Sequence, residues 1–308
     1  MPERTFKILP EIRDILHFQC AGSNKFENDM NNKIRENIIA TIYDIDEEYF
    51  NDQEYGTLWK SFYSKFHTII SSLCILPFNK INIQQKAGMS HNYDFIISFL
   101  DENKNAIKSV NLEFKHNNTD VSKLCQFLEL YDKDCKDKFS ICQEMSYAEF
   151  YYDNYLDKYL KTIPEITCVK PDRNEYLKYV SDINYKHPFF YMLYENKKNE
   201  VNKKKQIAND SVKEYIKLYS SSFKFDKILE KIKSSQNDKV FLLWDCTNFH
   251  IQMVDVENIV ITGIKKINNF SFDLDVLNFK YNICVRIRWA NNNGLANPSW
   301  KFSFIRKQ

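Results

Sequence analysis

Asp94, Glu113 and Lys115 are residues whose types and spacing could do chemistry together. Asp94 precedes the apolar stretch "FIISFL", while Glu113 and Lys115 close the stretch "VNLEFK" that follows a polar turn. Two carboxylates that meet form a site of hard oxygen ligands, which Mg²⁺ prefers. A lysine beside such a site can orient a water molecule and offset the charge of a phosphate, so the trio would suit phosphodiester cleavage.

A β-hairpin is the element that must position this trio. The segment "YDFIISFLDENKNAIKSVNLEFK" has two strand patterns around a polar turn at 101–105. A hairpin brings the start of one strand beside the end of the next, so we expect Asp94 and Glu113 to lie close enough to share one divalent ion. Side chains alternate along a strand, so Glu113 and Lys115 share one face and Phe114 takes the other. The Phe114 carbonyl is a candidate for a third oxygen ligand.

The spacing of Asp94 and the Glu113-Phe114-Lys115 segment resembles the motif of the PD-(D/E)XK nuclease superfamily, which has the restriction-endonuclease-like fold. The resemblance covers about residues 80–160, where "LCQFLELYD" and "SYAEFYYDNYL" are similar to segments of such proteins from large DNA viruses. The C-terminal "RIRWANNNGLANPSWKFSF" is similar, more weakly, to type II restriction enzymes. Tyr93 stands where the family has a proline, which many members lack.

The resemblance implies a core of one helix, a three-strand meander, a second helix and a further strand. It implies that Asp94 and Glu113, with the Phe114 carbonyl, bind Mg²⁺, that Mn²⁺ can substitute, and that Lys115 assists the attacking water. The implied activity is that of a metal-dependent deoxyribonuclease. Such an enzyme would cut double-stranded DNA internally and at specific sequences, with a homodimer as one candidate assembly.

Alternative interpretations remain open at this point. A nuclease for repair, junction resolution or homing would use the same trio, and a non-catalytic nucleic-acid-binding protein could keep the same fold. A chain rich in Asp, Glu and Lys also meets this spacing by chance, in which case Glu113 and Lys115 are a solvated pair on an edge hairpin. Family members often add an acid from the first helix, and here Glu36 and Glu54 are equal candidates.

Polar residues close to the trio in sequence are candidates for DNA contacts. Lys86 and Ser90 precede Asp94 in a strand-to-loop stretch and could touch the DNA backbone. Gln126 follows Lys115 at the distance where family members often place a polar residue near the phosphate. For Lys86, Ser90 and Gln126, the alternative is an ordinary polar surface residue.

Two groups of basic residues farther along the chain are also candidates for DNA binding. Lys203, Lys204 and Lys205 form the densest basic run and could contact phosphates, or simply be solvated. Arg286 and Arg288 alternate on one expected strand. Since arginine can donate two hydrogen bonds to a guanine edge, this strand could enter a DNA groove.

Helix and strand patterns occur in blocks. Helical spacing over 28–50 and 56–73 is followed by strand patterns over 80–115, a helical and aromatic middle, and a closing series of strands. We therefore expect an α+β protein, with a restriction-endonuclease-like α/β core sheet flanked by helices and a mixed, mostly antiparallel C-terminal region. The run "NKKNEVNKKK" marks the expected boundary. Residues 1–195 would form the nuclease core with its N-terminal helices, and 196–308 a helical connector and a β-rich, DNA-binding region.

Composition and charge exclude several classes of protein. Apolar residues make up 44% of the 308 residues, which favours a packed core over disorder. A net charge of +2 argues against non-specific coating of nucleic acid, although a local basic groove is compatible with it. Eight cysteines without a CxxC pair, and the lack of an apolar signal or membrane-spanning stretch, indicate a soluble, intracellular protein without a membrane partner. The viral resemblance implies a virus-encoded enzyme that acts in the host cytoplasm or is carried in the virion.

Overall fold

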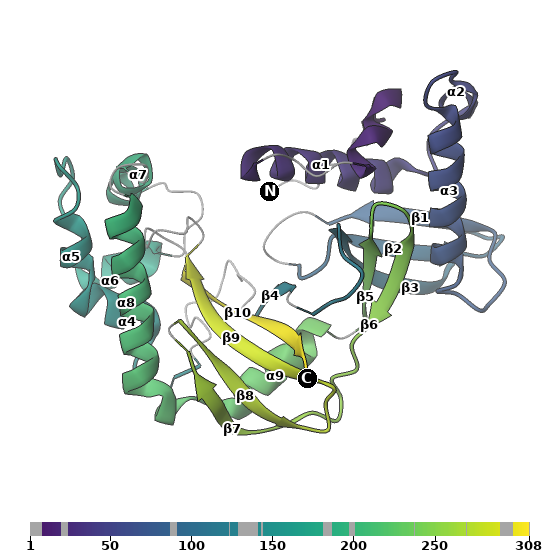
Figure 1. Ribbon diagram of the computed structural model, residues 1–308. Helices are drawn as coiled ribbons and strands as arrows, with labels where there is room; N and C mark the ends of the chain where they lie inside the picture. The colour runs from purple at the N-terminus through teal and green to yellow at the C-terminus, as the bar shows by residue number, and fades with distance from the viewer. Residues whose placement is uncertain are drawn as a thin grey trace. The chain divides into compact units, whose positions relative to one another are not determined.

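The computed structural model describes residues 8–19, 24–86, 91–122, 124–128, 141–142, 144–180, 187–196, 201–236, 238–268, 270–289 and 298–307. Over these residues the protein has the α+β fold that the sequence predicts (Figure 1). The chain forms two compact units. One unit comprises Met1–Val121 and Gln236–Asp255, and the other comprises Ser122–Ser235 and Val256–Gln308.

The first unit is built around a sheet with the strand order β1-β2-β3-β5-β6 (Figure 1). The first three strands form an antiparallel meander, β5 pairs with β3 in parallel, and β6 is antiparallel to β5. The strands are β1 (Lys80–Gln85), β2 (Phe95–Leu100), β3 (Ala106–His116), β5 (Lys239–Trp244) and β6 (Phe249–Met253). The helices that precede them are η1 (Ile12–Phe18), α1 (Lys25–Thr41), α2 (Glu47–Asn51) and α3 (Gly56–Ser71).

Strand alternation produces the core of the first unit. Phe95, Ile97 and Phe99 of β2 are fully buried, in step with the two-residue period of a strand. Ile38 of α1 and Trp59 of α3 belong to the same apolar cluster, so both helices pack against this sheet. Burial of each large apolar side chain contributes about 1.5–3 kcal/mol. This layer therefore holds the β2–β3 hairpin firmly against the helices.

Local sequence signals set where the helices of the first unit begin. The Asn24 side chain caps α1 by accepting a hydrogen bond from the Glu27 backbone N–H at 3.0 Å. The first residue of α3 is Gly56, where a Cβ atom would collide with the Phe50 carbonyl oxygen. Only glycine therefore allows α2 and α3 to approach this closely.

The second unit contains an antiparallel sheet with the strand order β4-β10-β9-β8-β7. Its strands are β4 (Cys125–Phe127), β7 (Val260–Ile267), β8 (Ser271–Leu277), β9 (Tyr281–Trp289) and β10 (Pro298–Arg306). Its helices are α4 (Tyr147–Asn154), α5 (Leu156–Leu160), α6 (Arg173–Tyr179), α7 (Pro188–Glu195), α8 (Val201–Tyr219), η3 (Ser220–Ser222) and α9 (Phe225–Gln236). Trp300 of β10 lies 5.9 Å, between ring centroids, from Phe223 and so links the sheet to the helical layer.

The boundary between the units differs from the expected one at 195/196. Helix α8 begins at Val201 and includes the three lysines, and the whole helix lies inside the second unit, which begins at Ser122. The closing strands also divide, because β5 pairs with β3 and β6 pairs with β5 in the first sheet, whereas β7 to β10 belong to the second. In the described part of the chain, no helix has the length and apolar character needed to cross a membrane.

Candidate active site

The β2–β3 hairpin places Asp94 opposite Glu113. Phe95 pairs with Leu112 across the two strands, so the next residues outward, Asp94 and Glu113, face each other where β2 begins. The Asp94 backbone N–H donates to the Leu112 carbonyl at 2.9 Å. The Asp94 carboxylate accepts a hydrogen bond from the Phe114 backbone N–H through Oδ2 at 2.8 Å. This contact fixes the direction of the carboxylate.

Two lysines hold the Glu113 carboxylate, one at each oxygen. Lys115 Nζ lies 2.7 Å from Oε1, and Lys239 Nζ contacts Oε2. Lys239 is the first residue of β5, and the parallel pairing of β5 with β3 brings its side chain to Glu113. The Glu113 and Lys239 side chains are 9% and 1% exposed, whereas the Lys115 side chain is 31% exposed. Sequence reasoning missed Lys239, because no local signal tells which strand β5 joins.

The opposite charges of this cluster shift the pKa values of one another's groups. Burial alone would raise the pKa of Glu113, but the ammonium groups of Lys115 and Lys239 outweigh it and hold the pKa below its ordinary value. Burial would lower the pKa of Lys115, but Glu113 and Asp94 raise it above its ordinary value. Burial does lower the pKa of Lys239, and Glu113 offsets only part of that effect. Lys115 is therefore a cation at neutral pH and not a free base.

Helix α1 supplies a further carboxylate, from Glu36. Burial and the negative charge of Asp94 raise the pKa of Glu36 to about 7, against the attraction of Lys115. Burial likewise raises the pKa of Asp94, and the charge of Glu113 adds to the rise. Glu54, the other acid weighed from the sequence, is exposed in the turn before α3. Of the two, Glu36 is the one coupled to the trio.

The donor atoms of this cluster are of the type that a hard divalent cation prefers. Asp94, Glu113 and Glu36 offer carboxylate oxygens and Phe114 a carbonyl, which matches the ligand preference of Mg²⁺. Across the described residues, no group of three or more His, Cys, Asp or Glu side chains is arranged to hold a metal ion. Lysines engage both oxygens of Glu113. A cation that binds Glu113 must therefore displace an ammonium group from it.

The raised pKa of Glu36 predicts a pH dependence of stability for the metal-free protein. A carboxyl whose pKa rises from 4.5 to about 7 binds its proton more tightly in the folded state. The free energy of unfolding therefore falls as the pH rises through this window, by at most about 3 kcal/mol at 1.36 kcal/mol per pKa unit. We expect the Glu36→Gln variant to escape this loss and to melt at a higher temperature than the wild type at about pH 8.

Thermal unfolding in the presence of a chelator, over about pH 4 to pH 8, measures this effect. Glu54→Gln is the matched control, because Glu54 is exposed and should leave the pH profile unchanged. Parallel profiles for the wild type and Glu36→Gln would show that folding does not raise the pKa of Glu36.

Lys86 and Ser90 were predicted to contact DNA near Asp94. Lys86 does lie beside Asp94 through the main chain, since its N–H donates to the Asp94 carbonyl at 2.7 Å. Its side chain is partly buried. Ser90 lies outside the described residues. Lys86 therefore remains a candidate on position alone.

Gln126 and Lys204 were predicted to lie at the surface, and both predictions are wrong. Gln126 belongs to the second unit, not to the unit that holds Asp94, and it is only 3% exposed on β4. Lys204 is fully buried on α8, where its ammonium group donates to the Asn196 carbonyl and lies 5.9 Å from the centre of the Tyr159 ring. The Lys204 side chain, which was predicted to contact DNA, thus contacts groups in the interior of the protein. Its neighbours Lys203 and Lys205 are exposed.

Arg286, Arg288 and Lys301 form a basic group on one face of the second sheet. Lys301 pairs with Arg286 across β9 and β10, and Arg288 follows two residues later on the same face. Arg286 donates to the Ser303 hydroxyl through Nη2 at 3.0 Å. Its Nε is buried, with no hydrogen-bond partner among the described residues. Burial and the two arginines lower the pKa of Lys301. The sequence indicated the arginines but not Lys301, which only the strand register adds.

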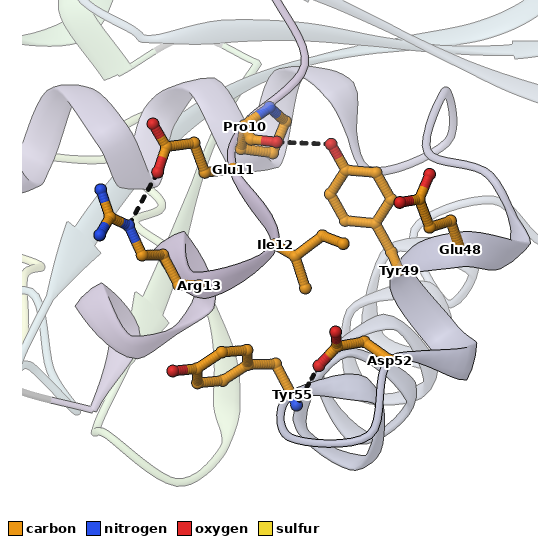
Figure 2. Close-up of a pocket in the computed structure, with 8 residues that line it drawn as sticks. All are labelled: Pro10, Glu11, Ile12, Arg13, Glu48, Tyr49, Asp52 and Tyr55. Carbon is orange, nitrogen blue, oxygen red and sulfur yellow. Dashed lines mark hydrogen bonds and ion pairs between the residues drawn. The ribbon is translucent and has the colours of Figure 1, made fainter.

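A surface hollow of about 460 Å³ lies elsewhere in the first unit, between η1, α2 and α3 (Figure 2). Figure 2 shows that its polar groups bond to each other: Arg13 pairs with Glu11, and the Tyr49 hydroxyl donates to the Pro10 carbonyl. Glu48 is a further acid in its wall, and the lining includes none of the trio. A hollow with this excess of acids is poorly suited to bind a phosphate.

Comparison of the chain with protein-family models, with curated proteins and with solved structures finds no match. The geometry and charges of the cluster around Glu113 are therefore the features that bear on function.

Proposed function

We propose that the protein is a Mg²⁺-dependent DNA endonuclease that hydrolyses phosphodiester bonds at specific sequences, in the manner of type II restriction enzymes. One observation carries the proposal. Asp94, Glu113 and Lys115 meet at one end of the β2–β3 hairpin, and the charge of Glu36 is coupled to them from α1. Paired carboxylates beside a protonated lysine suit the cleavage of a phosphodiester.

Each residue of the cluster has a distinct role in this proposal. Asp94, Glu113 and the Phe114 carbonyl would hold Mg²⁺ or, with the same oxygen ligands, Mn²⁺. When bound, the ion would supply Lewis-acid chemistry, which polarises a phosphate oxygen and lowers the pKa of a water molecule. Lys115, partly exposed and protonated, turns from Glu113 toward the phosphate and stabilises its developing charge. Glu36, in its ionised form, accepts a hydrogen bond from the attacking water.

Double-stranded DNA is the proposed substrate, bound in part by the basic group of the second unit. Arg288 is exposed, and Arg286 lies two residues before it on the same face of the sheet. Such guanidinium groups can donate to phosphates or to guanine edges. Lys203 and Lys205 add exposed positive charge on α8. A homodimer would supply two copies of the site, one for each strand of the duplex.

A non-catalytic nucleic-acid-binding protein is the second candidate. The observation that favours it is the closed state of Glu113, whose oxygens are both engaged by lysines. A nuclease that had become a binding protein could use such ion pairs to replace the metal. The trio itself argues the other way, since both acids and the lysine are present.

A cleavage assay separates these candidates. The purified protein is incubated with plasmid and phage DNA, with Mg²⁺ or with a chelator, and the fragment ends are sequenced. We expect Mg²⁺-dependent internal cuts at one short sequence. Cuts at varied sequences or at branched DNA would indicate a repair, junction-resolving or homing enzyme. DNA binding without cleavage, in the presence of each divalent ion tested, would support the non-catalytic candidate and overturn the proposed activity.

A further inference from the structure

Lys239 is an additional lysine of the Glu113 site, beyond the trio. Its ammonium group contacts Glu113 Oε2 and lies 4.9 Å from the centre of the Phe241 ring. Its backbone pairs with Asn111 in the parallel ladder between β3 and β5. The strand pairing, the ring and the carboxylate together hold this side chain in one place.

Lys115 and Lys239 differ in their freedom to move. The Lys115 side chain is 31% exposed and leaves β3 one residue before the strand ends at His116. The Lys239 side chain is 1% exposed. A cation that approaches Glu113 can displace Lys115 into solvent, whereas Lys239 has no open path. Oε1 of Glu113 is therefore the oxygen that a cation can reach, and Oε2 stays with Lys239.

We propose that Lys239 is a positioning residue of the metal site, which holds Glu113 by Oε2, aims Oε1 at the divalent ion and weakens the binding of that ion through its own positive charge. This inference rests on the proposed function of the same site. The acids and Lys115 of the motif must contact the cation or the substrate, so none of them can hold and aim Glu113. This task falls to Lys239.

In this role, Lys239 lowers the affinity for the metal ion and raises the rate of cleavage. A cation on Oε1 lies close to the Lys239 ammonium group, and like charges repel strongly where water is excluded. Removing the lysine therefore tightens metal binding. Removing it also lets the carboxylate rotate, so the bound ion is held less accurately for reaction and cleavage slows. A lysine with only a structural task would not separate the two quantities.

Calorimetric titration of Ca²⁺ into the full-length protein, without DNA, measures the first effect. Single-turnover cleavage at saturating Mg²⁺ measures the second. We expect Lys239→Met to bind Ca²⁺ about tenfold more tightly or better, from loss of a nearby like charge, and to cleave about tenfold more slowly or worse, from loss of orientation. Lys239→Arg, which keeps the charge, should restore the weak binding of the wild type.

Lys204→Met is the matched control, because Lys204 is an equally buried lysine in the other unit. It should lower the melting temperature and leave Ca²⁺ affinity unchanged. Lys239→Gln keeps a hydrogen-bond donor for Oε2 and replaces Lys239→Met if that variant does not fold. Folded, neutral variants at position 239 with unchanged or weaker Ca²⁺ binding would overturn the inference alone. A wild type that binds no divalent ion and cuts no DNA would overturn the proposed function as well.

Discussion

The Asp94→Asn variant is expected to lose DNA cleavage by about 10²–10³-fold, the equivalent of a few kcal/mol of transition-state stabilisation, while its affinity for DNA persists. Asparagine has nearly the same shape as aspartate, and its Oδ1 can still accept the hydrogen bond from the Phe114 N–H. It lacks the negative charge that a divalent ligand site needs. The change therefore removes the carboxylate that is proposed to bind the metal, without disturbing the hairpin.

Cleavage rates and DNA binding constants for the same preparations check this result. Asp29→Asn is the matched control, because Asp29 is exposed on α1 of the same unit and should cut normally. Full activity of Asp94→Asn would remove the metal assignment and, with it, the proposed mechanism.

Lys115→Ala should lower the single-turnover rate by about 10²-fold or more and change DNA affinity little. Glu113 and Asp94 raise the pKa of Lys115, so its side chain is a cation, and in the proposed mechanism this cation stabilises charge in the transition state. Loss of a group that acts only in the transition state lowers the rate even when the substrate is saturating. The measurements are rates at saturating DNA and binding constants at several salt concentrations.

Arg288→Ala provides the contrasting case, because Arg288 is exposed and outside the trio. If it contacts a phosphate, its loss should weaken binding and reduce the slope of log affinity against log salt by about one, with the rate at saturating DNA preserved. A Lys115→Ala variant that cuts at the normal rate on saturating DNA would make Lys115 a surface partner of Glu113 and nothing more.

The hairpin that holds Asp94 and Glu113 could be predicted from the sequence, because strand alternation and turn position are local properties. The α+β class follows from the same kind of signal. Which long-range pairing completes the sheet is not a local property. Lys239 meets Glu113 only because β5 joins β3 in parallel, and the residues around Lys239 would look the same on any other strand. The choice of Glu36 over Glu54 depends in the same way on how α1 packs.

The sequence contained a signal for the burial of Lys204, namely the helical spacing of apolar residues after it. The three adjacent lysines were instead interpreted together. Lys204, Ala208, Val212 and Tyr215 are all buried and recur at helical spacing, so they form the inward face of α8. Because the three lysines are adjacent, all three were predicted to lie at the surface. The helical period instead assigns Lys203 and Lys205 to the solvent and Lys204 to the interior.

The first unit is made from two stretches of chain, and this has a consequence for its synthesis. Strand β3 leaves the ribosome early, but its parallel partner β5 follows only after all of 122–235 has been made. Until then β3 is an open edge with unpaired backbone groups, which favours chaperone binding or misassembly. Glu113 lacks Lys239 throughout this interval. The cluster around Glu113 is therefore complete only once β5 has been made and has paired with β3, so the proposed site cannot act before that point.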